Sequence, residues 1–180
     1  KLDVVKKIAC ITYTNVGADT ITSRLDIKND VVEVCTIHSF LYANVIKPYI
    51  HLVANEFGVN IDNLVVIDDS NFKSEGSARI VLNYLSKSWL DPKIYLKGLK
   101  NCNWCYADHE YKHYKPKYAQ AYYVKSGKRY VANDWYMGFK KWLWNQGYVS
   151  FDDILYFSYI LFSRYPIIYK LLKAKYPYVF

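Results

Sequence analysis

Short apolar runs alternate with amphipathic stretches in the first third of the chain. "KKIACITYT" and "VVEVCTIHS" are short and rich in β-branched residues, which is typical of buried strands. "ADTITSRLD" and "FLYANVIKPYIHLVANEFG" carry apolar residues at helical spacing, and Gly58 follows the second as a helix-ending residue. The order strand–helix–strand–helix predicts a parallel α/β sheet.

The middle of the chain predicts helices and one hairpin. "NIDNLVVIDDSN" predicts a loop with a short apolar piece, and "EGSARIVLNYLSKSWL" a helix capped by Ser74 or Ser77. Residues 91–133 have no clear period, so we predict irregular structure there, apart from a β-hairpin about Ser126–Gly127. "DWYMGFKKWLWNQG" then predicts an amphipathic helix that ends at its glycine.

The C-terminal stretch predicts a return to the sheet. "SFDDILYFSYILFSRYPIIYKLLKAKYPYVF" predicts a helix capped at Ser150, a short second helix and a final strand, "YPYVF". We therefore expect an α/β fold with a partial parallel sheet and a large, mainly α-helical insert carrying a small β-hairpin. The predicted domains are 1–42 (sheet domain), 43–149 (basic, aromatic insert) and 150–180 (return to the sheet domain).

Composition indicates a folded chain with a polyanionic partner. The 180 residues are 52% hydrophobic and 22% charged, which is typical of folded domains, and the formal net charge is +8. No apolar run reaches the about 18 residues that a membrane span needs, so we expect no membrane partner. Four cysteines are few for a disulfide scaffold, which favours a reducing cytoplasm. A first residue other than Met and a strand-like last segment favour a fragment of a longer protein.

The positive charge is concentrated in one segment. Residues 1–86 have a net charge of −2, residues 87–141 a net charge of +8, and residues 142–180 a net charge of +2. The middle segment also holds 13 of the 33 aromatic residues. Cations for phosphates beside rings for bases indicate a nucleic-acid surface, although a solvated basic face gives the same composition. The candidate contacts are Lys112, Lys115, Lys117, Lys125, Lys128 and Arg129.

Hydroxyl-rich residues stand at the ends of both predicted N-terminal strands. "TYTN" ends the first and "TIHS" the second. Because ligands of open α/β sheets bind beyond the carboxyl ends of parallel strands, these side chains are expected to share one rim. Hydroxyls and an amide can bind phosphates, and an exposed ring can stack on a base for about 1–3 kcal/mol.

Three stretches in this order resemble superfamily 1 DNA helicases of the UvrD/Rep/PcrA type. "ITYTNVGADTITSRL" is similar to the family pattern T-[FY]-T-N-x-A-A-x-x-[ML]-x-x-R-[LI], and "VCTIHSF" to G-T-[FI]-H-[SG]-[FL]. "SFDDILYFSYILF" resembles the F-x-D-[LI]-L helix before the Walker B strand, which "KYPYVF" resembles in turn. The resemblance implies the first RecA-like domain of an ATP-dependent helicase, with an inserted subdomain.

The same resemblance implies which residues contact single-stranded DNA. Tyr13 would lie near a base, and the others around the backbone: Thr12, Thr14, Asn15, Thr36, His38 and Ser39. Local structure offers an alternative for several: Thr14 or Asn15 as a helix cap, and His38 as a rim residue with no ligand. Phe40 is expected in the core, and Asp152 and Asp153 to interact with a helix dipole rather than to do chemistry.

Two positions depart from the family pattern. Val16-Gly17 replaces the usual Lys-Ala, which removes a basic residue beside the expected phosphates. Thr20 replaces a customary glutamate in the following helix. From the first departure we expect weaker DNA binding at this rim, and from the second a loss of side-chain pairing within that helix.

The chain has no G-x-x-x-x-G-K-[ST] loop and no D-E pair for Mg²⁺. We therefore expect the ATP and Mg²⁺ sites of the parent helicase to lie outside these residues, and the fragment alone to be inactive. Its expected partner is single-stranded or partly duplex DNA, and a nuclease or repair partner stays open.

A rival interpretation is a non-enzymatic nucleic-acid-binding module stabilised by zinc. Two thiols and two imidazoles occur close together: Cys102, Cys105, His109 and His113. The gap between the second cysteine and the first histidine is much shorter than in common zinc fingers, which favours side chains without a metal.

Overall fold

The computed structural model describes residues 6–25, 31–100, 103–107, 110–114, 123–125, 128–130 and 132–180, with the backbone alone from 100 to 136. The chain forms two compact units. Unit 1 comprises Lys1–Val53 and Asp153–Phe180, and unit 2 comprises Ala54–Asp152. The predicted domain boundaries after residues 42 and 149 stay a prediction.

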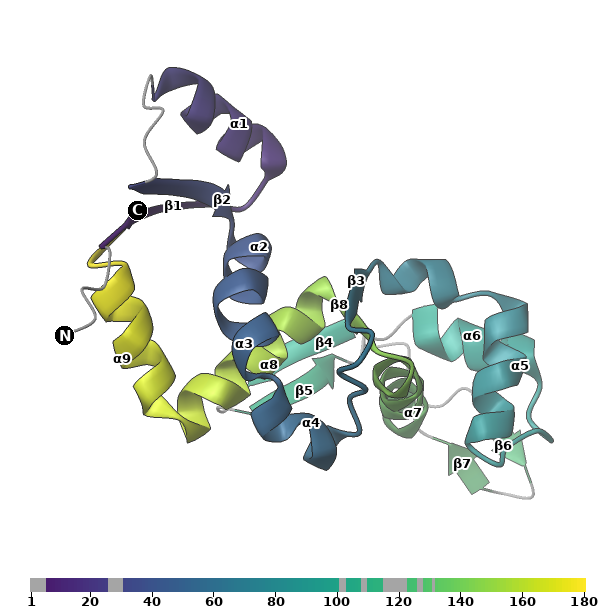
Figure 1. Cartoon of the computed structure of the whole chain (residues 1–180). Coiled ribbons are helices and arrows are strands. Elements are labelled where there is room, and N and C mark those ends of the chain that lie inside the picture. Colours follow the sequence, from purple (N-terminus) through teal and green to yellow (C-terminus); the bar gives the residue numbers. More distant parts are fainter. Residues whose placement is uncertain are drawn as a thin grey trace. The chain divides into compact units, whose positions relative to one another are not determined.

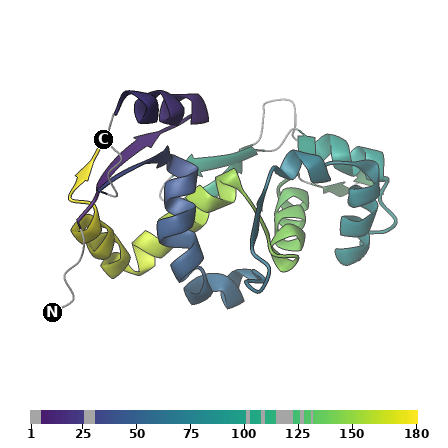
Figure 2. The ribbon, with the colours of Figure 1, turned by 45° about the horizontal axis from the view of Figure 1, so that its top comes forward.

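Unit 1 contains a three-stranded parallel sheet, in the order β2-β1-β9. Its strands are β1 (Ile8–Thr12), β2 (Val32–Thr36) and β9 (Tyr178–Val179). Helix α1 (Asn15–Arg24) lies on one side of β1 and β2, while α2 and α9 lie on the other (Figures 1 and 2). The predicted strand–helix–strand order, the parallel sheet and the final strand are confirmed.

A continuous helical run follows β2. It comprises α2 (Ile37–Leu41), a π-helical turn η1 (Tyr42–Ile46), α3 (Lys47–Tyr49) and α4 (His51–Phe57). The wider turn comes just before Pro48, which has no N–H to donate; the Lys47 N–H donates to the carbonyl of Tyr42, five residues earlier. The run begins at Ile37, so the predicted start at Phe40 was three residues late.

Helices α8 (Phe151–Arg164) and α9 (Pro166–Lys175) lead back to the sheet. As predicted, α8 begins directly after Ser150 and has acidic residues in its first turn. Pro166 starts α9, where its missing N–H costs nothing.

One face of the unit 1 sheet rests on a small aromatic cluster. Ala9, Phe40 and Tyr176 are buried together, and the last two rings meet edge-on with centroids 5.0 Å apart. The expectation that Phe40 belongs to the core is therefore confirmed. The Tyr176 hydroxyl donates its one proton to Glu33 Oε2 at 2.6 Å, and Asn44 Oδ1 lies 3.1 Å from the same oxygen. Burial, and then the hydrogen bond to Glu33, raise the pKa of Tyr176.

Unit 2 contains a parallel strand pair that the sequence did not predict. β3 (Val65–Ile67) pairs with β8 (Tyr148–Ser150), although the pattern indicated a loop at the first and only a helix cap at the second. Gly147 sits before β8 with φ +83°, and a Cβ there would lie 2.6 Å from the Asn63 carbonyl oxygen. Only glycine fits this close approach.

Helices fill the crossover between β3 and β8. They are η2 (Asp69–Phe72), α5 (Glu75–Tyr84), α6 (Pro92–Lys100) and α7 (Ala132–Asn145). Two antiparallel pairs accompany them: β4 (Asn103–Ala107) with β5 (Glu110–Tyr114), and β6 (Tyr123–Lys125) with β7 (Lys128–Tyr130). The predicted hairpin is thus confirmed, with Ser126–Gly127 outside the described residues. The prediction of irregular structure for 91–133 was wrong, because α6 and the β4–β5 pair lie there.

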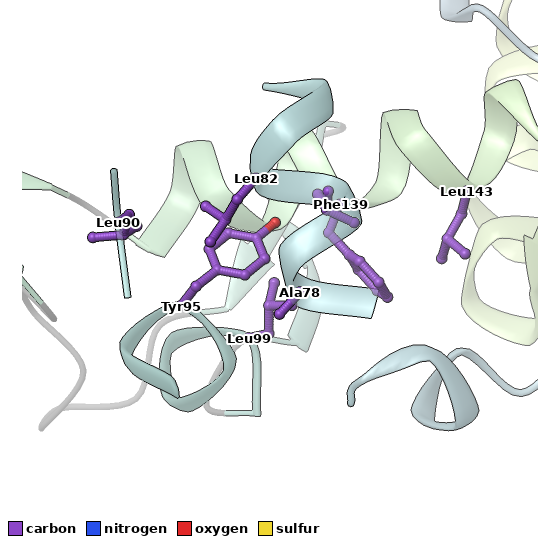
Figure 3. Packing of buried hydrophobic residues seen from close by; sticks show 8 residues of the cluster. Ala78, Leu82, Leu90, Tyr95, Leu99, Phe139 and Leu143 are labelled. Atoms are coloured by element: carbon purple, nitrogen blue, oxygen red, sulfur yellow. The ribbon is translucent and has the colours of Figure 1, made fainter. Parts of the chain in front are cut away.

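The α5, α6 and α7 helices enclose the core of unit 2. Figure 3 shows the Tyr95 ring close to Leu82, with Ala78 and Leu99 beside it. Tyr95 and Phe139 are both fully buried, and burial raises the pKa of Tyr95 well above its ordinary value. The cluster comprises Ala78, Val81, Leu82, Leu90, Tyr95, Leu99, Phe139 and Leu143.

A buried lysine links α7 to the end of β8. Lys140 is 0% exposed, and its Nζ donates to Asp69 Oδ2 and to Ser150 Oγ, both at 2.8 Å. Asp69 also lies 3.4 Å from Lys73. Because the ammonium has a carboxylate and a hydroxyl as partners, its burial is compensated.

Candidate nucleic-acid interface

The register of β1 and β2 brings the two hydroxyl-rich motifs together. Five consecutive pairs align the strands, from Ile8 with Val32 to Thr12 with Thr36. Directly beyond the last pair, the rings of Tyr13 and His38 meet edge-on with centroids 6.1 Å apart. Residues separated by more than twenty positions therefore form one rim, as the sequence predicted.

The threonines of this rim also cap helices. Thr14 Oγ1 accepts a hydrogen bond from the Gly17 N–H at 3.1 Å at the start of α1. Thr36 Oγ1 accepts from the Ser39 N–H at 3.3 Å at the start of α2. The capping alternative is thus observed for Thr14, whereas Asn15 is the first residue of α1 itself.

The hydroxyl groups that cap the helices have further hydrogen-bonding capacity. Thr12 donates its proton to the Thr14 carbonyl at 2.9 Å, and Thr36 donates to Ser39 Oγ at 3.0 Å. The hydroxyl of Thr14 accepts from the Gly17 N–H and that of Ser39 accepts from Thr36, so each retains an O–H that it can donate. Both residues are exposed, and a phosphate oxygen is an acceptor that suits them.

The ring of Tyr13 is the most exposed large side chain of the rim. It is 82% exposed, and neighbouring Val16 is 75% exposed. Val16 stands where the family pattern has a lysine, so the rim offers hydroxyls, an amide and rings without a Lys or Arg of its own. Stacking and neutral hydrogen bonds are the interactions that such a surface provides.

Gly17 is a rim residue whose role the sequence reasoning missed. A Cβ at this position would lie 3.2 Å from Thr14 Oγ1 and 3.3 Å from Thr12 Cβ. Both contacts would be tighter than usual, so glycine relieves crowding between the first turn of α1 and the end of β1. Its signal in the sequence was the departure from the usual alanine.

The candidate basic contacts of the insert lie between residues 100 and 136, where the backbone alone is described. Lys112 lies in β5, where the register pairs it with Cys105. In the hairpin Lys125 pairs with Lys128, and Arg129 with Val124. Lys115 and Lys117 lie outside the described residues.

The Cys/His cluster is described only in part. Cys105 lies in β4 opposite Lys112, and His113 lies in β5 opposite Trp104. Cys102 and His109 lie outside the described residues. Within the part of the chain that is described, no group of three or more His, Cys, Asp or Glu side chains could hold a metal ion.

The described residues do not fit ATP. Strands β1 and β2 each lead into a helix through a threonine cap, not through a glycine-rich phosphate loop. The described ranges hold no group of three or more His, Cys, Asp or Glu side chains placed to bind a metal ion. None of the helices in those ranges combines the length and apolar character that crossing a bilayer would require.

The comparison with protein families decides the identity of the chain. Residues 4–180 match the model of the UvrD/REP helicase N-terminal domain. The chain belongs to this family. Its mixed α/β structure, with a small parallel sheet, is consistent with a partial RecA-like domain, and the chain is part of a DNA helicase. Comparison with curated proteins gave no match.

Proposed function

We propose that this part of a UvrD/REP-type helicase supplies contacts to single-stranded DNA in an ATP-dependent translocase. The observation that supports this proposal is the rim at the paired ends of β1 and β2. There Tyr13 is 82% exposed, and its ring centroid lies 6.1 Å from that of His38. Tyr13 stacks on a base, while Thr12, Thr14, Asn15, Thr36, His38 and Ser39 surround the backbone. The basic residues of unit 2 bind phosphates of the same strand or of an adjoining duplex.

In this proposal ATP and Mg²⁺ are bound by other segments of the parent protein, in the cytoplasm. The 180-residue chain then binds DNA without hydrolysing ATP. The family match favours this proposal over a non-enzymatic module, because the match extends across both units.

The rim is tested by Tyr13→Ala in the 180-residue chain. We expect a loss of about 1–3 kcal/mol in affinity for single-stranded DNA, because one stacked base is lost. Fluorescence anisotropy with a labelled oligothymidylate measures the Kd, and Tyr178→Ala, also an exposed tyrosine, is the matched control. An unchanged Kd in Tyr13→Ala would assign that ring to packing against His38.

Salt dependence separates neutral from charged contacts. Each phosphate neutralised by a cation contributes about 0.7 to the slope of log K against log salt for a single strand. Since the rim carries no Lys or Arg, Tyr13→Ala should lower affinity while leaving this slope unchanged. A slope that flattens in Tyr13→Ala would contradict the neutral character of the rim.

A further inference from the structure

A half-buried asparagine links three elements of unit 1. Asn44 lies in the π-helical turn η1, which directly follows α2. Its Nδ2 donates to the Phe40 carbonyl at 3.1 Å and faces Glu33 Oε1 at 3.5 Å. Its Oδ1 accepts from Lys175 Nζ at 2.9 Å and lies 3.1 Å from the Tyr176 hydroxyl. One amide therefore connects β2, the helical run that follows it and the end of α9.

The charges on either side fix the orientation of this amide. Its oxygen faces the ammonium of Lys175, and its nitrogen faces the carboxylate of Glu33. A rotated amide would place its N–H groups against the ammonium and its oxygen against the carboxylate, so only one orientation suits both neighbours. Hydrogen bonds to charged groups are also stronger than those between neutral groups. Asn44 thus has the defined position that a linking residue needs.

Helix α2 depends on such a link for its direction. It has only five residues, and helices this short are not stable by themselves. Because helices bend at π-helical turns, α3 and α4 do not by themselves fix the axis of α2. The bond from Asn44 to the Phe40 carbonyl acts on α2 directly, near its end. The first turn of the same helix carries His38.

The same link reaches the rim through β2. Glu33 precedes Thr36 by three residues, and Thr36 both pairs with Thr12 and caps α2. The Glu33 carboxylate accepts the proton of Tyr176 at 2.6 Å, and the ring of Tyr176 packs edge-on against Phe40. β2 and α2 are therefore tied to each other independently of the threonine cap.

We propose that Asn44 is a positioning residue of the rim: by fixing α2 against β2, it sets the contact between the rings of His38 and Tyr13. The Tyr13 ring is largely exposed and meets that of His38 edge-on, so the position of α2 determines where the Tyr13 ring lies. A ring that is already held in place loses less conformational freedom when it stacks on a base. The consequence for DNA binding rests on the proposed function, whereas the ring contact does not.

The first test needs no DNA. Proton–carbon NMR of the whole chain resolves the imidazole signals of its four histidines, and His38→Gln identifies the one at the rim. Tyr13→Ala should shift the His38 signal, because it removes the neighbouring ring. Asn44→Leu should shift it in the same direction, because α2 is released from β2. A His38 signal that keeps its original position in Asn44→Leu would overturn the proposal.

The second test measures binding of a fluorescein-labelled oligothymidylate. Asn44→Leu should raise the Kd about three- to tenfold, as expected of a residue that acts on a ligand without touching it. The salt slope should stay unchanged, because no phosphate contact is removed. If Asn44→Leu does not fold, Tyr176→Phe serves instead, since it removes only the hydrogen bond to Glu33 and keeps the ring. It should shift the His38 signal by a smaller amount, and an unshifted signal would overturn the proposal.

Two controls separate positioning from a general loss of stability. Ile168→Val removes one methyl group from a buried position of α9 outside the network. It should lower the urea midpoint without changing the His38 signal or the Kd. Asn83→Leu makes the same exchange as Asn44→Leu at an exposed position of α5 in unit 2 and should change neither. If Ile168→Val raises the Kd as much as Asn44→Leu, stability alone explains the effect and the proposal fails.

The results distinguish this proposal from the proposed function. If Tyr13→Ala binds DNA more weakly while Asn44→Leu leaves both the Kd and the His38 signal unaltered, the proposed function stands and the positioning role fails. If the unaltered chain does not bind the oligonucleotide, the proposed function fails, and the His38 signal alone decides whether Asn44 positions the rim.

Discussion

The sheet of unit 1 and the helical core of unit 2 bury their residues very differently. In β1 and β2 only Ala9 is buried, and the two residues of β9 are exposed. An apolar groove of about 330 Å³ lies on one face, lined among others by Ile11, Phe40 and Leu172. In unit 2 eight residues form a closed cluster in which the large rings are fully buried. The candidate DNA rim thus belongs to the less tightly packed region, and unit 2 resembles a self-supporting domain.

The largest expected effect comes from the aromatic cores of the two units. Phe139→Ala should lower the free energy of unfolding by about 4 kcal/mol, since its closed surroundings cannot collapse around the missing ring. Phe40→Ala should cost about 2–3 kcal/mol, because Phe40 borders a groove that is already open to solvent. Urea unfolding followed by circular dichroism measures both. Equal losses would remove the difference in packing between the units.

The next effect tests the buried ion pair of unit 2. Lys140→Met should destabilise the chain by about 3 kcal/mol, because Asp69 and Ser150 lose the ammonium that bonds to both at 2.8 Å. Lys141→Met, at the exposed next position, should change stability by less than about 0.5 kcal/mol. Similar losses in the two variants would mean that the ion pair adds nothing to the core.

A smaller effect concerns the buried tyrosine of unit 1. Tyr176→Phe should cost about 1 kcal/mol at neutral pH, because it removes the hydrogen bond donated to Glu33. The pKa of this phenol is raised by its burial and by Glu33, so its contribution is complete below the unfolded pKa of about 10 and is lost as pH rises through the higher folded pKa.

Alkaline unfolding separates Tyr176 from ordinary tyrosines. Stability should fall above about pH 10 in the unaltered chain, and the fall should be shallower in Tyr176→Phe. Tyr178→Phe, at a 62% exposed position, should follow the unaltered profile. Parallel pH profiles for all three would show that the phenol at 176 ionises equally in the folded and unfolded states.

The smallest expected effect is a gain in stability from a substitution in unit 2. Ser86 follows α5 with φ +55°, a left-handed conformation that glycine adopts without strain. Ser86→Gly should therefore raise stability by about 0.5–1 kcal/mol, whereas Ser86→Ala keeps the strain and should bring no gain. Urea midpoints of the two variants decide the point, and a loss in Ser86→Gly would count against a strained turn.

The sequence predicted the parts of the fold that have local signals. Strand ends rich in β-branched residues, the Ser74 cap, Gly58 and Gly147 all lie where expected. It missed the β3–β8 pair, because two three-residue strands separated by about eighty positions have no period of their own and form only once the crossover packs. It missed α6 for a related reason, since its lysines and single proline hid the buried positions of Tyr95 and Leu99.

The candidate site was predictable where parallel pairing dictates it. Strand ends on one edge brought Tyr13 beside His38, as the pattern implied. Which side chain caps a helix depends on backbone geometry at single residues, so the sequence could not decide between Thr14 and Asn15 as the cap of α1.

The ladder between β1 and β2 decides which changes of length the rim tolerates. Because five paired positions align Thr12 with Thr36, the connection from Leu25 to Val31 has no part in setting the distance between the two rings. Residues inserted there would leave the rim unaltered. One residue deleted within β1 would instead advance every later side chain by about 3.3 Å and turn it to the opposite face. Variation among related chains is therefore expected to accumulate in that connection and to spare the length of the strand.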